Sequence, residues 1–267
     1  MPAWFYSLPI YFALVCTFVF CNLISLIGHF FSQRFLFKVD NNDVVNKVVW
    51  QTILFFTTIF ITFWIATNWS NLGQLELTSI REATTIEQLY NDVDSLESDQ
   101  RKSIEQNLFD YLNSVIEDEY PNLSTGKLNQ KTTAMYRTLV LSIYEYTPAK
   151  NMAEEMRYHR ILEQLSQLSN YREDRLNYLE GNLRGPLLVF FLVMIIIGCF
   201  WTGFVKTKSM AFTLFIIMSQ NLIISSSCWL ILEMDKPFQG ELRADSSAFV
   251  TVHQELRYFT KVHLQNN

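Results

Sequence analysis

Polar side chains interrupt an apolar, aromatic stretch at residues 48–69, and these side chains are the best placed to do chemistry. In an apolar environment few groups can hydrogen-bond to them, so they mark either a path for water and ions or a contact between helices. In the first case threonine hydroxyls would line a pore, and phenylalanine rings would form a hydrophobic constriction that gates by dewetting. In the second, small and hydroxyl side chains pack one helix on another. The pore-lining candidates are Gln51, Phe55, Phe56, Thr58, Phe60 and Thr62.

Residues for catalysis or metal binding are not arranged in a recognisable pattern. The four histidines, His29, His159, His253 and His263, lack metal-ligand spacing. The sequence has no Gly-rich phosphate loop, no nucleophile elbow and no paired acids within an apolar stretch. Its net charge of −5 also argues against nucleic acid as a partner. We therefore expect no enzyme activity, no cofactor and no bound metal.

Four long uncharged blocks must position the polar residues. They cover about residues 8–31, 48–69, 186–205 and 210–232, in a chain that is 49% hydrophobic and contains 22 Phe. About 20 apolar helical residues are enough to cross the hydrocarbon core of a bilayer. A water-soluble helix rarely has so long an uncharged stretch, because one of its faces meets solvent. The pattern predicts an all-α membrane protein with four spans.

The segment between the second and third blocks is polar and acidic. Residues 70–185 include 12 basic and 19 acidic side chains, and their apolar positions recur at helical spacing. We expect three helical stretches there: one that contains Ile104 and ends at Pro121, one at 128–146 and one at 152–183. Arg172, Glu173, Asp174 and Arg175 are interpreted as a solvated helical face. The segment is predicted to be a small water-soluble helical bundle.

Short connections predict the topology. Loops at 32–47 and 206–209 make each pair of spans an antiparallel hairpin, which divides the chain into a first hairpin (1–69), the soluble bundle (70–185), a second hairpin (186–233) and a tail (234–267). Five basic residues lie in the two loops, so the positive-inside rule places the loops in the cytoplasm and the bundle outside. Five basic residues on the other side oppose this orientation: Arg172, Arg175, Arg184, Lys236 and Arg243.

Several short motifs resemble one known family. They are Asn42-Asp43-Val44, Arg81-Glu82-Ala83, the stretch 115–121 with Glu117 and Glu119, the stretch 172–176, and the stretch 234–240 with Asp235, Pro237, Phe238 and Gly240. In order and spacing they are similar to the bestrophin-like domain family, a group of mostly bacterial and plant membrane proteins. Val45 and Asn46 depart from the family, which usually has a small residue and Gly there. This departure affects the expected local turn.

The resemblance implies a fold and a function. Bestrophins are ion channels that assemble as pentamers around a pore lined by the second span, so it implies a homo-oligomer that conducts small inorganic ions across a lipid bilayer, here a bacterial inner membrane. The alternative is a non-conducting module in which the spans anchor a sensing or scaffolding bundle. A channel requires a symmetric ring, whereas the module predicts a monomer or dimer without an axial cavity. Ion selectivity does not follow from the sequence.

The motif residues also have structural interpretations. Pro237 cannot donate a backbone hydrogen bond and Gly240 accepts positive φ, so they are expected to end the fourth helix and turn the chain. Phe238 would anchor at the membrane interface or against a neighbouring helix. Asp43 fits an N-cap of the second helix better than an ion site. A role for the 234–240 stretch at a pore mouth is the alternative.

Overall fold

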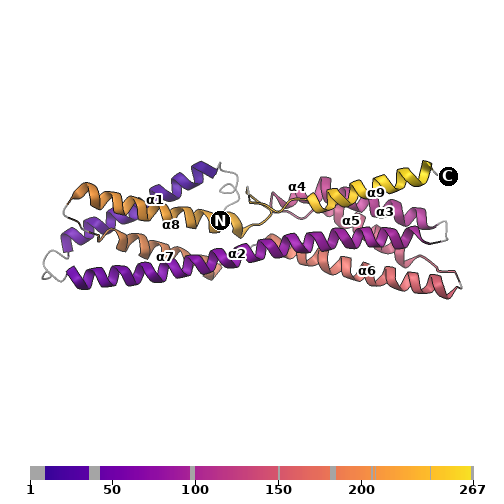
Figure 1. Ribbon diagram of the computed structural model, residues 1–267, viewed down its shortest axis with the longest axis horizontal. Coiled ribbons are helices and arrows are strands. Elements are labelled where there is room, and N and C mark those ends of the chain that lie inside the picture. Colours follow the sequence, from indigo (N-terminus) through magenta and orange to yellow (C-terminus); the bar gives the residue numbers. More distant parts are fainter. Residues whose placement is uncertain are drawn as a thin grey trace. The chain divides into compact units, whose positions relative to one another are not determined.

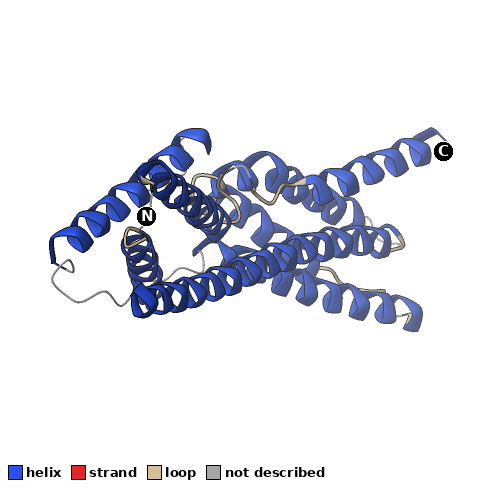
Figure 2. Ribbon diagram, turned by 60° about the vertical axis from the view of Figure 1, so that its left-hand side comes forward, coloured by secondary structure: helices blue, strands red, loops and turns tan. Residues whose placement is uncertain are grey.

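The computed structural model describes residues 10–35, 43–96, 100–149, 151–180, 185–205, 207, 209–240 and 242–265. Throughout these ranges the regular structure is helical, with no strand (Figure 2). The helices are α1 (Ile10–Phe35), α2 (Asp43–Asp94), α3 (Gln100–Ser114), the π-helix Val115–Glu119, α4 (Tyr120–Leu123), α5 (Gln130–Tyr144), α6 (Met152–Asn177), the 3₁₀ turn Tyr178–Glu180, α7 (Gly185–Thr202), α8 (Met210–Asp235) and α9 (Ser247–Gln265).

The helices form two compact units. The first, here called the apolar unit, contains residues 1–71 and 181–235, and the second, the polar unit, contains residues 72–180 and 236–267. Helix α2 is one unbroken helix of 52 residues, and it contributes to both units (Figure 1).

Four helices contain the uncharged blocks of the sequence. Among the described residues, α1, α2 and α8 each have an apolar stretch long enough to cross a membrane. The corresponding stretch of α7, Val189–Thr202, is shorter. The structure therefore supports an all-α membrane protein with three candidate spans.

Helix α1 packs on α7 and α8 through small and polar residues. A Cβ atom on Gly28 would overlap the Phe200 carbonyl, and one on Gly203 would overlap the Ser25 carbonyl, so the backbones of α1 and α7 touch there. The Ser25 hydroxyl donates to the Cys199 carbonyl at 2.7 Å. Small residues are the usual means of close helix approach in membranes, because lipid provides no hydrophobic drive for association.

The first part of α2 packs on α7 in the same unit. A Cβ on Gly198 would lie 3.1 Å from Cγ2 of Thr57, which is buried. The rings of Trp64 and Phe191 stack with centroids 6.3 Å apart. The core of the apolar unit is completed by Ile195, Cys199, Ile224, Ile231 and Leu232. Outside this core, α1, α7 and α8 expose large apolar side chains, as expected for surfaces that face lipid.

The polar unit has a conventional core, with apolar stripes turned inward. Leu89 of α2, Leu108 of α3, Leu139 of α5 and Leu168 of α6 are all buried in it. Helix α9 belongs to the segment interpreted from sequence as a tail, and it adds Phe249, Val252 and Leu256 to this core.

The prediction that Pro121 ends its helix is wrong. A π-helical turn follows α3, in which the Tyr120 N–H donates to the Val115 carbonyl, and the chain then continues as α4 to Leu123. Pro121 lies in the first turn of α4. A proline is tolerated in a first helical turn because its missing N–H would have no partner there. The change of hydrogen-bond register at the π turn therefore allows the helix to continue past Pro121.

Candidate functional site

The polar and aromatic residues of α2 lie on two sides of the helix. Gln51, Phe55, Phe56, Thr58 and Thr62 are exposed in the single chain. Phe55 is 62% exposed, a large fraction for an aromatic ring. A continuous exposed side with two hydroxyls, an amide and two rings suits either contact with other copies or the lining of a water-filled path.

The opposite side of α2 packs inside the apolar unit. Phe60 makes an edge-to-face contact with Phe190 of α7, with ring centroids 4.9 Å apart, and lies 5.7 Å from Trp64. The Thr57 hydroxyl donates to the Ile53 carbonyl of its own helix at 2.8 Å. The sequence analysis counts Phe60 among the pore-lining candidates. In the single chain, however, its ring packs against Phe190 and Trp64.

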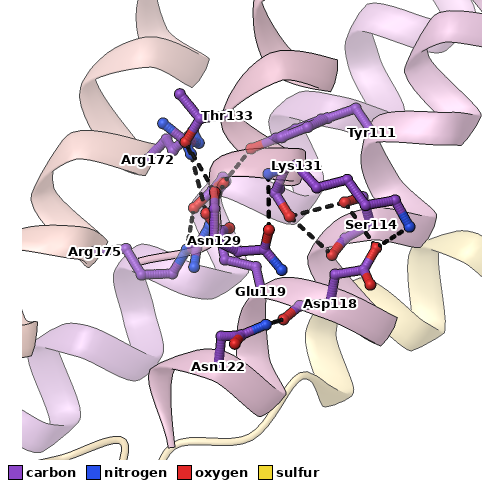
Figure 3. Close-up of polar contacts among 12 residues, drawn as sticks. Tyr111, Ser114, Asp118, Glu119, Asn122, Asn129, Lys131, Thr133, Arg172 and Arg175 are labelled. Carbon is purple, nitrogen blue, oxygen red and sulfur yellow. Dashed lines mark hydrogen bonds and ion pairs between the residues drawn. The ribbon is translucent and has the colours of Figure 1, made fainter. Parts of the chain in front are cut away.

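A second cluster of polar residues, the buried ion-pair network, lies inside the polar unit (Figure 3). Arg175 of α6 is fully buried and donates from Nε to Glu82 Oε2 at 2.6 Å and from Nη2 to Glu119 Oε2 at 2.7 Å. The same Nη2 lies 3.0 Å from Glu82 Oε1, which also accepts from the Tyr111 hydroxyl at 2.9 Å. Both carboxylates are fully buried, so their charges depend on these partners.

Arg172 extends the network by one helical turn. Its Nη2 donates to Glu119 Oε1 at 3.0 Å and to the Thr133 hydroxyl at 3.3 Å. The guanidinium carbon lies 5.0 Å from the ring centroid of Tyr136. Two arginines thus balance two glutamates, and the network is formally neutral.

The surroundings of Arg175 explain why one of its donors makes no hydrogen bond. Nη1 is buried without a partner among the described residues. The guanidinium carbon lies 5.4 Å from the ring centroids of both Tyr120 and Phe249, so aromatic faces replace an acceptor. Burial alone would lower the pKa of Arg175, but the carboxylates of Glu82 and Glu119 outweigh it and raise this pKa well above its usual range. The arginine therefore stays charged.

The interpretation of residues 172–175 as a solvated face is half wrong. Glu173 and Asp174 are exposed, whereas the side chain of Arg175 is fully buried and that of Arg172 is 11% exposed. Helical geometry turns adjacent residues by about 100°, so charges that are neighbours in sequence can face opposite ways. The charge run looked uniform because its buried partners, Glu82 and Glu119, are far away in sequence.

The acidic motif residues have different environments. Glu119 lies at the centre of the network, and the π turn that ends at Glu119 places its carboxylate between the two arginines. Glu117 is exposed. Asn42 lies outside the described residues, as does the side chain of Asp43, at which α2 begins.

The 234–240 motif forms the end of a helix and a turn. Helix α8 ends at Asp235, a buried residue, and Gly240 has a φ of 79°. The Pro237 carbonyl accepts from the Ala244 N–H at 2.7 Å, which closes the turn. Phe238 is 2% exposed and packs edge-to-face on Tyr120 within the polar unit. These contacts agree with the structural interpretation of the motif.

Sequence reasoning missed the network as a unit. Its members come from α2, the π turn and α6. Its two acids, Glu82 and Glu119, are 37 positions apart in sequence, so no local spacing indicates that they lie together. One signal was available, since Glu82, Glu119, Arg172 and Arg175 all lie in the short motifs that carried the family resemblance.

One protein family and several solved structures are similar to this chain. The model of the bestrophin-like domain matches residues 15–249, which is most of the chain. No curated protein matches the chain. Among solved structures, one variant of a bacterial bestrophin homolog from Klebsiella pneumoniae has a TM-score of 0.68 at 13% identity, with 93% of this chain and 99% of that chain covered. A second variant has a TM-score of 0.66 at 16% identity, with 91% and 98% covered. At such identities the likeness shows the fold alone.

Proposed function

Because the chain belongs to the bestrophin-like domain family, we propose that it is an oligomeric ion channel whose pore is lined by the exposed side of α2. The observation that carries this proposal is the exposure of Gln51, Phe55, Phe56, Thr58 and Thr62 along the first part of α2, whose other side packs in the apolar unit. A ring of copies would gather these side chains around one axis, as the family resemblance implies with a pentamer.

The proposed pore has two kinds of surface. Thr58 and Thr62 would offer hydroxyls to water and ions, and the phenylalanine rings would narrow the path to a hydrophobic neck. Of the three rings among the candidates, Phe55 and Phe56 fit the neck best, because Phe60 packs on Phe190 in the single chain. A hydrophobic neck imposes little charge preference, so the proposal makes no statement about ion selectivity.

The membrane topology is part of the proposal. Helix α7 has 18 residues, which extend about 27 Å and approach the thickness of the hydrocarbon core. With α7 as a span beside α1, α2 and α8, the chain crosses a bacterial inner membrane four times as two hairpins. The basic loops then face the cytoplasm and the polar unit faces outward.

Planar-bilayer recording of the purified protein tests the proposal. We expect ion currents, a ring-shaped particle with more than two copies, and a larger single-channel conductance for Phe55→Ala, because the substitution widens the neck. Phe12→Ala is the matched control, since Phe12 is also exposed but lies on α1. The control variant is expected to conduct like the wild type.

The alternative, a membrane-anchored module that does not conduct, predicts different results. A monomeric or dimeric particle with no current would replace the channel by this alternative. If Phe55→Ala and Phe12→Ala alter the currents equally, the protein is a channel but α2 does not line its pore.

A further inference from the structure

A surface cavity in the polar unit has no role in the proposed pore. Its volume is about 370 Å³, within the range of small-molecule sites, and it lies where α5, α6 and the loop before α5 meet. Its lining includes Arg172, Tyr136 and Glu173. The cavity therefore combines one cationic group, one anionic group and an aromatic ring at the edge of the buried network.

Arg172 retains capacity to bind an acceptor at this cavity. Both of its hydrogen bonds, to Glu119 and Thr133, use Nη2. In the part of the chain that the structure describes, neither the buried Nε nor Nη1 makes a hydrogen bond, and Nη1 is the donor left for a ligand. The Tyr136 ring and the Glu119 carboxylate hold the guanidinium in place. A pre-positioned guanidinium with an unused donor favours a carboxylate, which it can bind through a charge-assisted hydrogen bond.

The charge balance around the cavity decides what kind of carboxylate fits. The buried network is neutral, so Glu173 leaves one uncompensated negative charge in the lining. A ligand with only a carboxylate would be repelled by Glu173, and one with only an amine would leave the Arg172 donor unused. A ligand that has both groups satisfies both residues.

The rest of the lining consists of three leucines, Leu128, Leu176 and Leu179, and two small polar residues, Ser169 and Asn177. We propose that this cavity is a binding site for a small zwitterion of the amino-acid type, whose carboxylate pairs with Arg172, whose ammonium group pairs with Glu173 and whose apolar side chain contacts the three leucines. The site is separate from the α2 lining, so the proposal does not depend on conduction.

Calorimetric titration of the full-length protein with three matched probes tests the site. L-Leucine has both charges, 4-methylpentanoate lacks the ammonium group and 3-methylbutylamine lacks the carboxylate. We expect leucine to bind at least about tenfold more tightly than either analogue, which corresponds to about 1.4 kcal/mol. Ser169→Trp, at an exposed position in the lining, should abolish binding of leucine because the indole fills the cavity.

Two neighbouring acids provide the decisive comparison. Glu173→Gln should reduce the affinity ratio of leucine to 4-methylpentanoate by about tenfold. Asp174→Asn is the control, because Asp174 is exposed but outside the lining, and it should leave the preference unchanged. Equal binding of the three probes, no binding of leucine, or equal effects of the two variants would overturn the proposal.

Discussion

The two units of this chain hold their helices together by different chemistry. In the apolar unit the contacts are close backbone approaches at Gly28 and Gly203 and hydrogen bonds between neutral groups such as Ser25 and Asn221. In the polar unit the helices converge on fully buried charges that neutralise each other. The difference follows from the surroundings. A helix in lipid gains little by hiding apolar surface, so fit and hydrogen bonds dominate, whereas a helix in water hides apolar surface and can include charges where partners are fixed.

Removal of Arg175 should cause the largest loss of stability. In Arg175→Met the carboxylates of Glu82 and Glu119 lose their main partner, and a broken buried pair costs about 3–5 kcal/mol. The free energy of unfolding of the polar unit is measured by denaturant titration in detergent, with circular dichroism as the signal. Arg160→Ala is the control, because its pair with Asp92 is exposed on the arginine side and should be worth at most about 1 kcal/mol. Similar losses in the two variants would contradict a special role for burial.

Glycine substitutions sharpen the comparison from the apolar side. Gly28→Ala should destabilise the apolar unit by about 1–3 kcal/mol, because its new methyl group overlaps the Phe200 carbonyl and forces α1 away from α7. Gly73→Ala should instead stabilise α2 by about 0.5–1 kcal/mol, since it meets no atom within 4 Å in a helix interior. Thermal unfolding of both variants checks the signs. A neutral Gly28→Ala would mean that α1 and α7 are not in backbone contact.

Loss of a neutral hydrogen bond should have a smaller effect. Asn221 donates to Ser25 at 2.9 Å and to Asn22 at 3.1 Å, both on α1. Asn221→Leu should cost about 0.6–1.7 kcal/mol, which runs from the average to the largest contribution of an interhelical hydrogen bond in a membrane protein. Denaturant unfolding, as for Arg175→Met, measures this loss. A loss as large as that of Arg175→Met would remove the distinction between the two units.

The pH dependence of stability gives the most subtle test. Burial raises the pKa of Tyr111 well above its usual range, and the nearby carboxylates of Glu82 and Glu119 raise it further. The folded state therefore keeps the phenol proton at a pH where the unfolded state loses it. The contribution of Tyr111 is fully present below the unfolded pKa of about 10 and declines as the pH rises above it. In Tyr111→Phe the decline of the unfolding temperature between pH 9 and pH 11 should be shallower, and an unchanged slope would contradict this assignment.

The sequence predicted those features that depend on local composition. Uncharged length predicted helices at all four blocks, and Pro237 with Gly240 predicted the turn after α8. Features that depend on distant partners were not predictable in this way. Arg175 looked like its exposed neighbours because Glu82 and Glu119 are brought to it only by the fold, and Pro121 looked like a helix end because a π turn leaves no clear mark in sequence.

The candidate pore side of α2 was partly accessible from sequence. Alternating hydroxyls and rings suggested a polar–aromatic surface, but only packing separates Phe60, which contacts Phe190, from Phe55, which is exposed. Sequence periodicity gives the relative directions of side chains on a helix, whereas the direction that faces a neighbour depends on that neighbour.

Cysteine modification at the proposed pore tests the central claim most directly. Thr62→Cys is made in a Cys16→Ser background, because Cys16 is the exposed native cysteine whereas Cys21, Cys199 and Cys228 are buried. A charged methanethiosulfonate reagent is then added during bilayer recording, with Leu23→Cys on the exposed side of α1 as the control. The account predicts that the current through Thr62→Cys channels falls on modification while that of Leu23→Cys channels persists. A persistent current through Thr62→Cys channels that mass spectrometry shows to be fully modified would contradict it.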